Sequence, residues 1–237
     1  MHLLVTRPQP EAERTAASLR RRGHMATLAP LLAFAPLDAA IGAGPWAGVL
    51  LTSANAVRAV RGHPAFALLR ALPAIGVGDR TAAAAREAGF AGVVSAAGDA
   101  RDLVAAAARR FAGIGGTILY LCGEDRAADV GAALAGAGVE VVTTPVYRMA
   151  AAARFPPPAA DALRAGRIQG VLHYSRRSAL AYLACAGNDR LEACALRPVH
   201  YALSAAVAAP LLQAGAGDIR VAARPDEAAL FERVGSG

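Results

Sequence analysis

The chain has 237 residues, enough for one large domain or for two domains of roughly 110 residues each. Hydrophobic residues make up 55% of it and aromatic residues 5%, and charged residues interrupt every alanine-rich stretch before it reaches the ~18 apolar residues of a membrane-spanning helix, which excludes that class. The net charge is +7 and all 25 basic residues are arginine, which excludes Schiff-base chemistry and a phosphate-loop lysine but suits a polyanionic ligand.

Short apolar runs alternate with helical patterns along the whole chain, as is typical of parallel sheets covered by helices on both faces. Strands are predicted at Leu3–Thr6, Ala26–Leu28, Gly48–Thr52, Ala74–Val77, Gly92–Ser95, Thr117–Leu121, Glu140–Thr143, Gly170–Tyr174, Val199–Ala202 and Ile219–Ala222. Helices are predicted at Gln9–Arg22, Ala54–Arg61, Arg80–Ala88, Ala100–Phe111, Ala127–Ala137, Ala159–Ala165, Arg177–Cys185, Ala205–Ala214 and Pro225–Arg233. The predicted fold class is therefore α/β, with five strands in each of two parallel sheets.

The sequence repeats itself twice. Leu3-Leu4-Val5 aligns with Ile118-Leu119-Tyr120, and Gly48–Ser53 aligns with Gly170–Ser175, so four segments follow one another in the order A, B, A′, B′. Two similar α/β halves leave a cleft between them, and small ligands usually bind in such clefts. The repeat therefore predicts a two-lobed binding protein or enzyme.

Two pairings of the four segments are compatible with the repeat. Sequential pairing, A with B, divides the chain near Gly113–Gly116. Crossed pairing joins residues 1–35 and 150–237 in a first, discontinuous lobe and inserts residues 38–146 as the second, with connectors near 33–38 and 146–153. Irregular chain is expected beside both crossings, at Pro36 and at Phe155–Pro158, and this favours the crossed pairing.

Polar residues follow most of the predicted strands, and open parallel sheets bind ligands beyond the carboxyl ends of their strands. Several of these residues stand at or near helix N-termini, where backbone N–H groups attract anions, although serine and threonine are also the usual helix caps. The candidate substrate-binding residues are Arg7, Ser53, Asn55, Gly78, Thr81, Gly123, Arg126, Ser175, Ser178 and Ser204.

Several kinds of site are missing from the sequence. It has no phosphate-binding loop, no nucleophile elbow and no histidine cluster, so neither a metal nor a nucleotide is expected. The arginines are scattered without interleaved aromatic residues, which argues against a nucleic-acid partner. Cys122, Cys185 and Cys194 are expected to be reduced thiols, and His173 a packed core residue. The first residues do not read as an export signal, so a cytoplasmic protein is expected.

Six short motifs occur in order over nearly the whole chain. They are Leu3–Pro8, Pro30-Leu31, Leu51–Val57, Val77–Ala82, Leu121–Arg126 and Pro145–Arg148. Together they resemble the uroporphyrinogen-III synthase family. The resemblance implies two flavodoxin-like lobes joined by a two-stranded connector, with the second lobe inserted in the first, and therefore the crossed pairing.

The resemblance also implies an activity. Uroporphyrinogen-III synthases are lyases of haem biosynthesis that close linear hydroxymethylbilane to uroporphyrinogen III, with loss of water and inversion of ring D, without a cofactor. The family's favoured acid is the tyrosine of the Pro-Val-Tyr segment, so Tyr147 is the predicted catalytic residue. Eight carboxylates on the substrate would suit arginines and hydroxyl groups at the strand ends. The chain departs from the family pattern at Ala202–Ala205, where Ser204 keeps a hydroxyl but the usual glycine is absent.

We expect a monomer whose partner is this small-molecule substrate, with no membrane partner. The alternative is a non-catalytic two-lobed module that binds an anion or a metabolite, because an arginine- and hydroxyl-lined cleft would also suit a sensor. Conversion of hydroxymethylbilane would separate the two.

Overall fold

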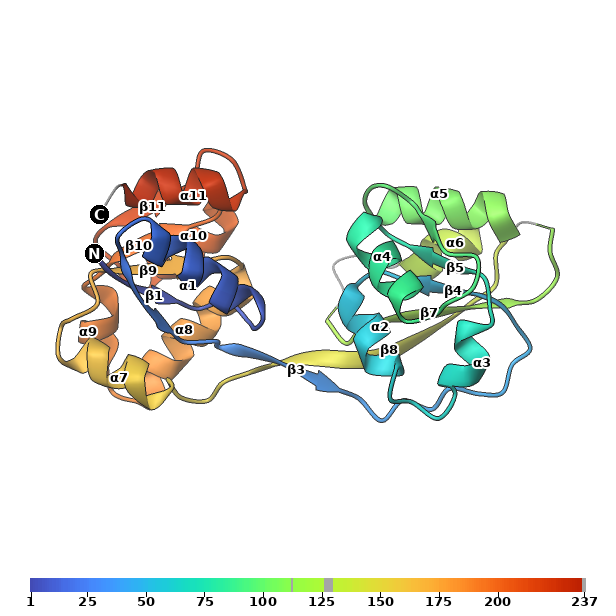
Figure 1. Cartoon of the computed structure of the whole chain (residues 1–237), viewed down its shortest axis with the longest axis horizontal. Helices are drawn as coiled ribbons and strands as arrows, with labels where there is room; N and C mark the ends of the chain where they lie inside the picture. Colours follow the sequence, from blue (N-terminus) through green and yellow to red (C-terminus); the bar gives the residue numbers. More distant parts are fainter. Residues whose placement is uncertain (112, 126–129, 236–237) are drawn as a thin grey trace. The chain divides into compact units, whose positions relative to one another are not determined.

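The computed structural model of the chain describes residues 1–111, 113–125 and 130–235. The chain divides into two compact units (Figure 1). Unit 1 consists of Met1–Ala33 and Ala150–Gly237, and unit 2 of Phe34–Met149. Each unit has its own sheet, so the chain enters unit 2 once and leaves it once.

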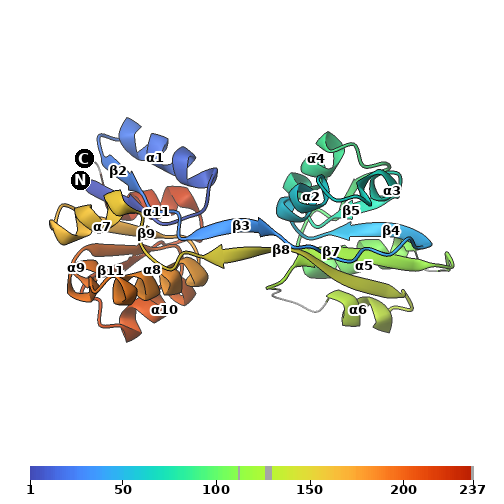
Figure 2. The same ribbon diagram turned by 90° about the horizontal axis from the view of Figure 1, so that it is seen from below.

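Unit 1 is a parallel sheet with helices on both faces (Figure 2). Its elements are β1 (His2–Val5), α1 (Glu11–Arg21), β2 (Met25–Leu28), α7 (Pro157–Arg164), β9 (Gly170–His173), α8 (Arg176–Asn188), α9 (Glu192–Leu196), β10 (Val199–Ala202), α10 (Ala205–Gln213), β11 (Ile219–Val221) and α11 (Glu227–Val234). The five strands lie in the order β11-β10-β9-β1-β2, and every neighbouring pair is parallel.

Alternation along the strands divides the core of unit 1 between the two faces of the sheet. Leu172 and Tyr201 belong to a buried cluster with residues of α1 and α11. Successive strand residues point to opposite faces, so His173 and His200 face the other way. There their rings contact Tyr182 of α8, which places α8 on the face opposite α1 and α11.

Unit 2 is also a sheet between two helical layers. Its elements are β3 (Leu32–Pro36), which begins in the range of unit 1, β4 (Trp46–Leu51), α2 (Ala54–Val60), α3 (Phe66–Arg70), β5 (Ala74–Gly76), α4 (Asp79–Glu87), β6 (Val94–Ser95), α5 (Ala100–Phe111), β7 (Thr117–Gly123), α6 (Val130–Gly136) and β8 (Val141–Ala151). Val49 and Leu119 pack with residues of α2 and α4, whereas Leu50 and Ile118 pack with residues of α5 and α6.

The sheet of unit 2 has six strands, in the order β3-β8-β7-β4-β5-β6, rather than the five predicted. Five of them are parallel. The additional strand, β3, lies at the edge of the sheet beside β8. The Leu37 N–H donates to the Val146 carbonyl and the Ala152 N–H to the Leu31 carbonyl, both at 2.9 Å. Residue numbers rise on one strand as they fall on the other, so β3 runs antiparallel to β8.

The two sheets have the same spatial order although the chain enters them at different points. Unit 1 reads β2-β1-β9-β10-β11 and unit 2 reads β8-β7-β4-β5-β6. The sequence repeat aligns β1 with β7 and β4 with β9, so equivalent strands occupy equivalent places. Unit 2 is therefore a circular permutation of unit 1.

All ten predicted strands are present among the described residues. The observed elements differ from the predicted ones in the length of β8, in the segments that were expected to be irregular and in two additional short helices. Strand β8 continues through Ala151, well beyond the predicted end at Thr143. The chain expected to be irregular at Pro36 is β3, and the run Phe155–Pro158 already contains the start of α7. Two five-residue helices, α3 and α9, were not predicted. The predicted helix start at Ala127 lies outside the described residues. No described helix is long and apolar enough to cross a membrane.

Candidate functional site

Arg7 follows β1 at the carboxyl edge of the sheet of unit 1, as predicted, but an internal carboxylate already contacts it. Its Nη1 donates to Glu227 Oε1 at 3.0 Å and to Thr15 Oγ1 at 3.2 Å. Its guanidinium carbon lies 4.1 Å from the centre of the Tyr174 ring, which follows the neighbouring strand β9. The ion pair and the ring together fix the direction of this guanidinium.

Glu227, the first residue of α11, is the centre of this cluster. Its Oε1 accepts hydrogen bonds from Arg7, from the Thr15 hydroxyl at 2.5 Å and from the Tyr174 hydroxyl at 2.7 Å. Burial raises the pKa of Tyr174, and the nearby Glu227 charge acts in the same direction. The Tyr174 phenol is therefore neutral and acts as a hydrogen-bond donor.

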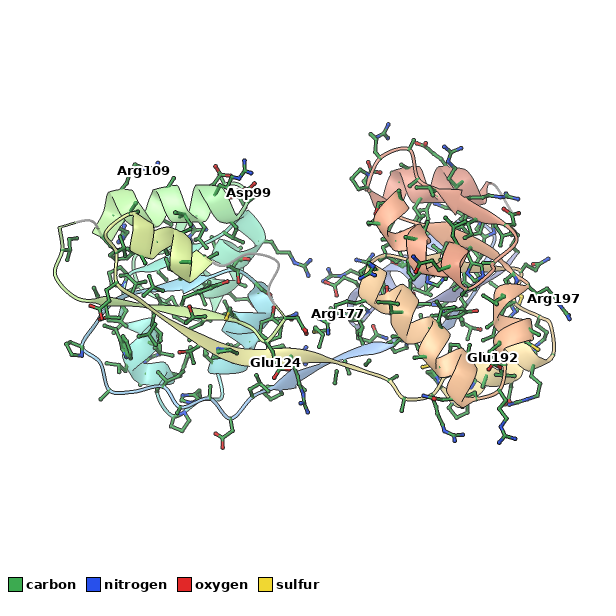
Figure 3. The ribbon with its side chains drawn as sticks, turned by 180° about the vertical axis from the view of Figure 1, so that it is seen from behind. Asp99, Arg109, Glu124, Arg177, Glu192 and Arg197 are labelled. Carbon is green, nitrogen blue, oxygen red and sulfur yellow. The ribbon has the colours of Figure 1, made fainter. Side chains whose placement is uncertain are left out.

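The predicted serines of unit 1 differ in what their hydroxyls do. Ser175 caps α8, and its Oγ accepts from the Ser178 N–H at 3.1 Å while Ser178 Oγ accepts from the Ser175 N–H at 3.2 Å. Both hydroxyls of this capping box are engaged by the helix start, where Arg177 also stands (Figure 3). Ser204 occupies the N-cap position of α10, but its side chain makes no capping hydrogen bond.

In unit 2 the predicted residues Ser53 and Asn55 lie at the start of α2. Ser53 Oγ accepts from the Asn55 N–H at 2.9 Å, which caps the helix. The Asn55 amide lies 3.7 Å from the sulfur of Met149 on β8. These contacts hold the start of α2 beside β8 (Figure 1).

The other predicted pair of unit 2 lies at the start of α4. Gly78 is the N-cap, and an added Cβ there would meet only the Gly98 carbonyl oxygen, at 3.8 Å. Thr81 is the third residue of the helix and is buried. A Cβ at the N-cap would therefore find room, with a backbone oxygen as its neighbour.

Tyr147 owes its position to an irregularity in the pairing of β7 with β8. Cys122 pairs with Pro145, and the next pair is Gly123 with Tyr147, so Val146 is an extra residue on β8. The Glu124 N–H donates to the Tyr147 carbonyl at 2.8 Å, and Glu124 is marked in Figure 3. The bulge turns the phenol of Tyr147 toward the end of β7.

Gly123 makes room for this phenol. A Cβ on Gly123 would lie 2.9 Å from Tyr147 Cζ, closer than real Cβ contacts, and 3.1 Å from its hydroxyl oxygen, which is tighter than most of them. A second neighbour of the Tyr147 ring is Phe34 of β3, with ring centres 5.8 Å apart and planes inclined by 26°. Of the remaining predicted residues, Arg126 lies outside the described residues.

Comparison with known proteins decides the family. The family model described as uroporphyrinogen-III synthase HemD matches residues 13–232, which is nearly the whole chain. The chain belongs to the uroporphyrinogen-III synthase family. The members of this family are enzymes of tetrapyrrole and haem biosynthesis that act on a small-molecule tetrapyrrole substrate. A non-catalytic binding module is not favoured by this match.

Solved uroporphyrinogen-III synthases agree in fold with this chain. The enzyme from Helicobacter pylori has a TM-score of 0.67 at 16% sequence identity, covering 99% of this chain and 98% of that one. A mutant of the enzyme from Thermus thermophilus has a TM-score of 0.52 at 15% identity, covering 99% and 97%. No curated protein sequence matches the chain.

Two buried histidines of this synthase-family chain were not predicted to meet. His173 Nε2 lies 3.0 Å from His200 Nδ1, and both side chains are fully buried, His173 as predicted. Their other ring nitrogens have no hydrogen-bond partner among the described residues. Burial lowers the pKa of His200 to about 4 and, with the neighbouring His200, holds the pKa of His173 well below its usual range. The pair is therefore neutral at physiological pH.

The described part of the chain shows no cluster of metal ligands at the strand ends. Among the described residues no three His, Cys, Asp or Glu side chains gather as metal ligands. One pocket, of about 490 Å³, lies between the C-terminal ends of α1 and α11, where Arg22 and Phe231 line it. That position is at the amino edge of the sheet, away from the predicted ligand-binding edge. The candidate site is thus defined by the polar groups that follow the strands and not by this pocket.

Sequence reasoning missed three residues that shape these edges. Glu227 was unremarkable because an acidic residue in the first turn of a helix is ordinary. Phe34 lies in a segment predicted to be irregular. Arg58, whose guanidinium carbon lies 4.2 Å from the centre of the Phe34 ring, was one arginine among many on predicted helices. An aromatic residue in a short apolar run beside a proline was the only available signal for the strand that carries Phe34.

Proposed function

We propose that the chain cyclises hydroxymethylbilane to uroporphyrinogen III, with loss of water and inversion of ring D, as a lyase. The observation that carries this proposal is the family match over residues 13–232. The spacing of the six motifs and the fold of the solved synthases support it.

The reaction needs positioning more than it needs strong acid–base chemistry. Departure of the terminal hydroxyl, which leaves as water after taking a proton, gives an electrophilic azafulvene. The substituted carbon of ring D attacks it, the resulting spiro intermediate fragments and recloses, and loss of a proton restores the pyrrole. The substrate can ionise and close unaided to the type I isomer, so the protein chiefly holds the chain in a productive conformation.

In this proposal Tyr147 assists departure of the hydroxyl. Its half-buried phenol lies against Phe34 and beside Gly123. A phenol can donate a hydrogen bond to a leaving hydroxyl without becoming fully ionised, which suits a substrate that needs little help. Gly123 then serves the reaction by leaving space for that ring rather than by touching the substrate.

The strand-end residues bind the carboxylate arms of the substrate. Arg7 presents its Nη2 and Nε, because Nη1 is held by Glu227 and Thr15. Ser175 and Ser178 act through the helix start that they cap, where backbone N–H groups point outward. The other proposed binding residues are Ser53, Asn55, Gly78, Thr81, Arg126 and Ser204.

The two compact units correspond in this proposal to the two lobes of the family. The order β2-β1-β9-β10-β11 of unit 1 is the 2-1-3-4-5 order of a flavodoxin-like sheet, and the permuted order of unit 2 matches it. The antiparallel strands β3 and β8 would form the two-stranded connector. We further propose that the protein is monomeric and cytoplasmic and that it needs no cofactor.

A coupled assay tests the function. Hydroxymethylbilane is generated in situ by a deaminase, the purified chain is added, and the products are oxidised and separated as type I and type III uroporphyrins. The expected result is predominantly type III isomer. If only the type I isomer of the uncatalysed reaction forms, the proposed function is wrong and a binding module becomes the better interpretation.

A further inference from the structure

Arg58 on α2 is an exposed arginine whose guanidinium has a defined place. Its guanidinium carbon lies 4.2 Å from the centre of the Phe34 ring on β3. Among the described residues no carboxylate lies within ion-pair distance of it. The charge is therefore held by an aromatic face and not neutralised by a neighbouring acid.

Phe34 connects this charge to the proposed proton donor. The same ring stacks on Tyr147, with ring centres 5.8 Å apart, and Tyr147 in turn fills the space beside Gly123. One aromatic residue thus supports both a cation and a phenol. These four residues, Phe34, Arg58, Gly123 and Tyr147, all belong to unit 2, so their arrangement does not depend on unit 1.

A second contact fixes the same face of α2. Asn55 precedes Arg58 by three positions, and residues at this spacing lie on one side of a helix. The Asn55 amide contacts Met149 on β8, while Arg58 contacts Phe34 on β3. Ser53 caps this helix two positions before Asn55. The face of α2 that carries Asn55 and Arg58 therefore lies against the strands that carry Tyr147 and Phe34.

This arrangement suits recognition of a carboxylate. A free arginine side chain loses much rotational freedom when it binds, and a guanidinium already restrained over a ring loses less. The ring leaves the hydrogen-bonding edge of the planar group available for a bidentate contact with a carboxylate. The alternative, that Arg58 only covers Phe34, requires no ligand and predicts no effect on substrate binding.

We propose that Arg58 binds a carboxylate arm of the substrate beside Tyr147, with Phe34 as the platform that orients it. The proposal rests on the proposed function, since it names one contact to the same substrate. The partner is recognised by its chemistry, a flexible aliphatic carboxylate attached to a pyrrole.

The test compares Arg58→Gln with Arg61→Gln, a control at the C-cap of the same helix, one turn further from Ser53 and, among the described residues, with no aromatic ring under its guanidinium. Arg61 is also exposed, so both variants lose one surface charge. We expect Arg58→Gln to raise KM about 3- to 10-fold, as for loss of one partly solvated charged contact, with kcat changed less than about twofold. Arg61→Gln should retain the KM of the parent protein.

Two further variants separate orientation from charge. Phe34→Leu keeps the arginine but removes the ring, so it should raise KM by a smaller factor than Arg58→Gln. Arg58→Lys keeps a positive charge but loses the planar group, so it should recover only part of the lost affinity. Circular dichroism checks that each variant is folded, and Arg58→Lys keeps the test open if the glutamine variant does not fold.

A binding measurement gives a readout that is independent of turnover. Titration with uroporphyrin III, an octacarboxylate, should give a Kd that Arg58→Gln raises by a factor similar to its effect on KM. The dependence of log Kd on log salt should also become shallower in that variant, because one ionic contact is lost. Equal KM and Kd values for Arg58→Gln and Arg61→Gln would overturn the proposal. A parent protein that makes no type III isomer would instead overturn the proposed function, whatever the variants bind.

Discussion

The buried pair His173 and His200 should make the stability of unit 1 fall as the pH is lowered through the range just below neutrality. The folded-state pKa of His200 is about 4, whereas an unfolded histidine has a pKa of about 6.5. Below pH 6.5 the unfolded chain therefore takes up a proton that the folded site does not. The free energy of unfolding falls from pH 6.5 toward pH 4 and levels off where folded His200 itself becomes protonated.

The size of the effect follows from the same two values. For His200 alone, the difference in proton uptake between pH 7.5 and pH 5 lowers the free energy of unfolding by about 2 kcal/mol. The pKa of His173 is lowered as well, so it adds to the loss with the same sign. Asp218 and the carbonyls of Ala195 and Leu196 favour the charged form of His200, although neither carbonyl completes a hydrogen bond to Nε2. The pKa of about 4 already includes the effect of these three groups.

Among the described residues, the groups that surround the pair carry little net charge that would stabilise an added proton. Tyr182 of α8 packs its ring on both histidines, and its hydroxyl donates a hydrogen bond to the Ala195 carbonyl at 2.8 Å. Tyr201 lies next to His200 on β10, and the nearby Asp218 and Arg220 carry opposite charges and pair with each other at 3.0 Å. A proton added to the pair therefore stays largely uncompensated.

The assay is urea-induced unfolding at several pH values between 7.5 and 5. Hydrogen exchange of peptides from β9 and β10 follows unit 1, and the fluorescence of Trp46, the single tryptophan, follows unit 2 as an internal control. The double variant His173→Leu/His200→Leu replaces both partners by apolar groups, so it should stay folded and lose most of the pH dependence. The pKa of His2 is also lowered, so a small slope should remain. A double variant with the slope of the parent protein would refute the reasoning.

The other predictions concern the two candidate edges. Tyr147→Phe should lower kcat by about 10²-fold or less with KM nearly constant and type III product retained, measured in the coupled assay; full kcat would remove the phenol from the mechanism. Gly123→Ala should displace the Tyr147 ring, because the added Cβ would lie 2.9 Å from it. The double variant Gly123→Ala/Tyr147→Phe should then have a kcat no lower than that of Tyr147→Phe alone, and additive losses of kcat would show that Gly123 acts separately. Glu227→Gln should lower the free energy of unfolding by roughly 1 kcal/mol after solvent screening. The control Glu232→Gln should change this free energy little, because the contact of Glu232 with Arg224 is exposed and 3.9 Å long. Equal urea midpoints for the two variants would argue against the Glu227 cluster.

The alternation of strands and helices could be predicted because strands buried on both faces read as continuous apolar runs. β3 was missed because Pro36 interrupts the strand pattern, yet a proline is tolerated there since β3 is the edge strand of its sheet. The length of β8 was underestimated because Pro145 also interrupts the strand pattern, so the predicted strand ended at Thr143. Proline is also accepted beside a bulge, and Pro145 lies next to the extra residue Val146. The helices α3 and α9 are too short to show a helical period.

The candidate site could be predicted only where strand ends determine it. Arg7 stands at the expected edge, but its partner Glu227 is 220 residues away in the chain, and only the packing of α11 beside α1 brings them together. Ser175 and Ser178 were predicted as ligand-binding residues, and the structure gives their hydroxyls a capping role that a serine three positions from another serine could have suggested. The position of Tyr147 depends on a bulge that periodicity does not reveal.

The hydrogen bond from Ala152 to Leu31 has a consequence for protein engineering. This bond holds the end of the first segment of unit 1, near Ala33, next to the start of its second segment, near Ala150. Residues 34–149 are inserted between these two points. Paired backbones lie about 5 Å apart, so a hairpin turn of about two to five residues could close unit 1 into a continuous domain after those residues are removed. The excised stretch would also begin and end on neighbouring strands. The gene could therefore be divided into two independently expressed cassettes, each with termini that a short linker joins.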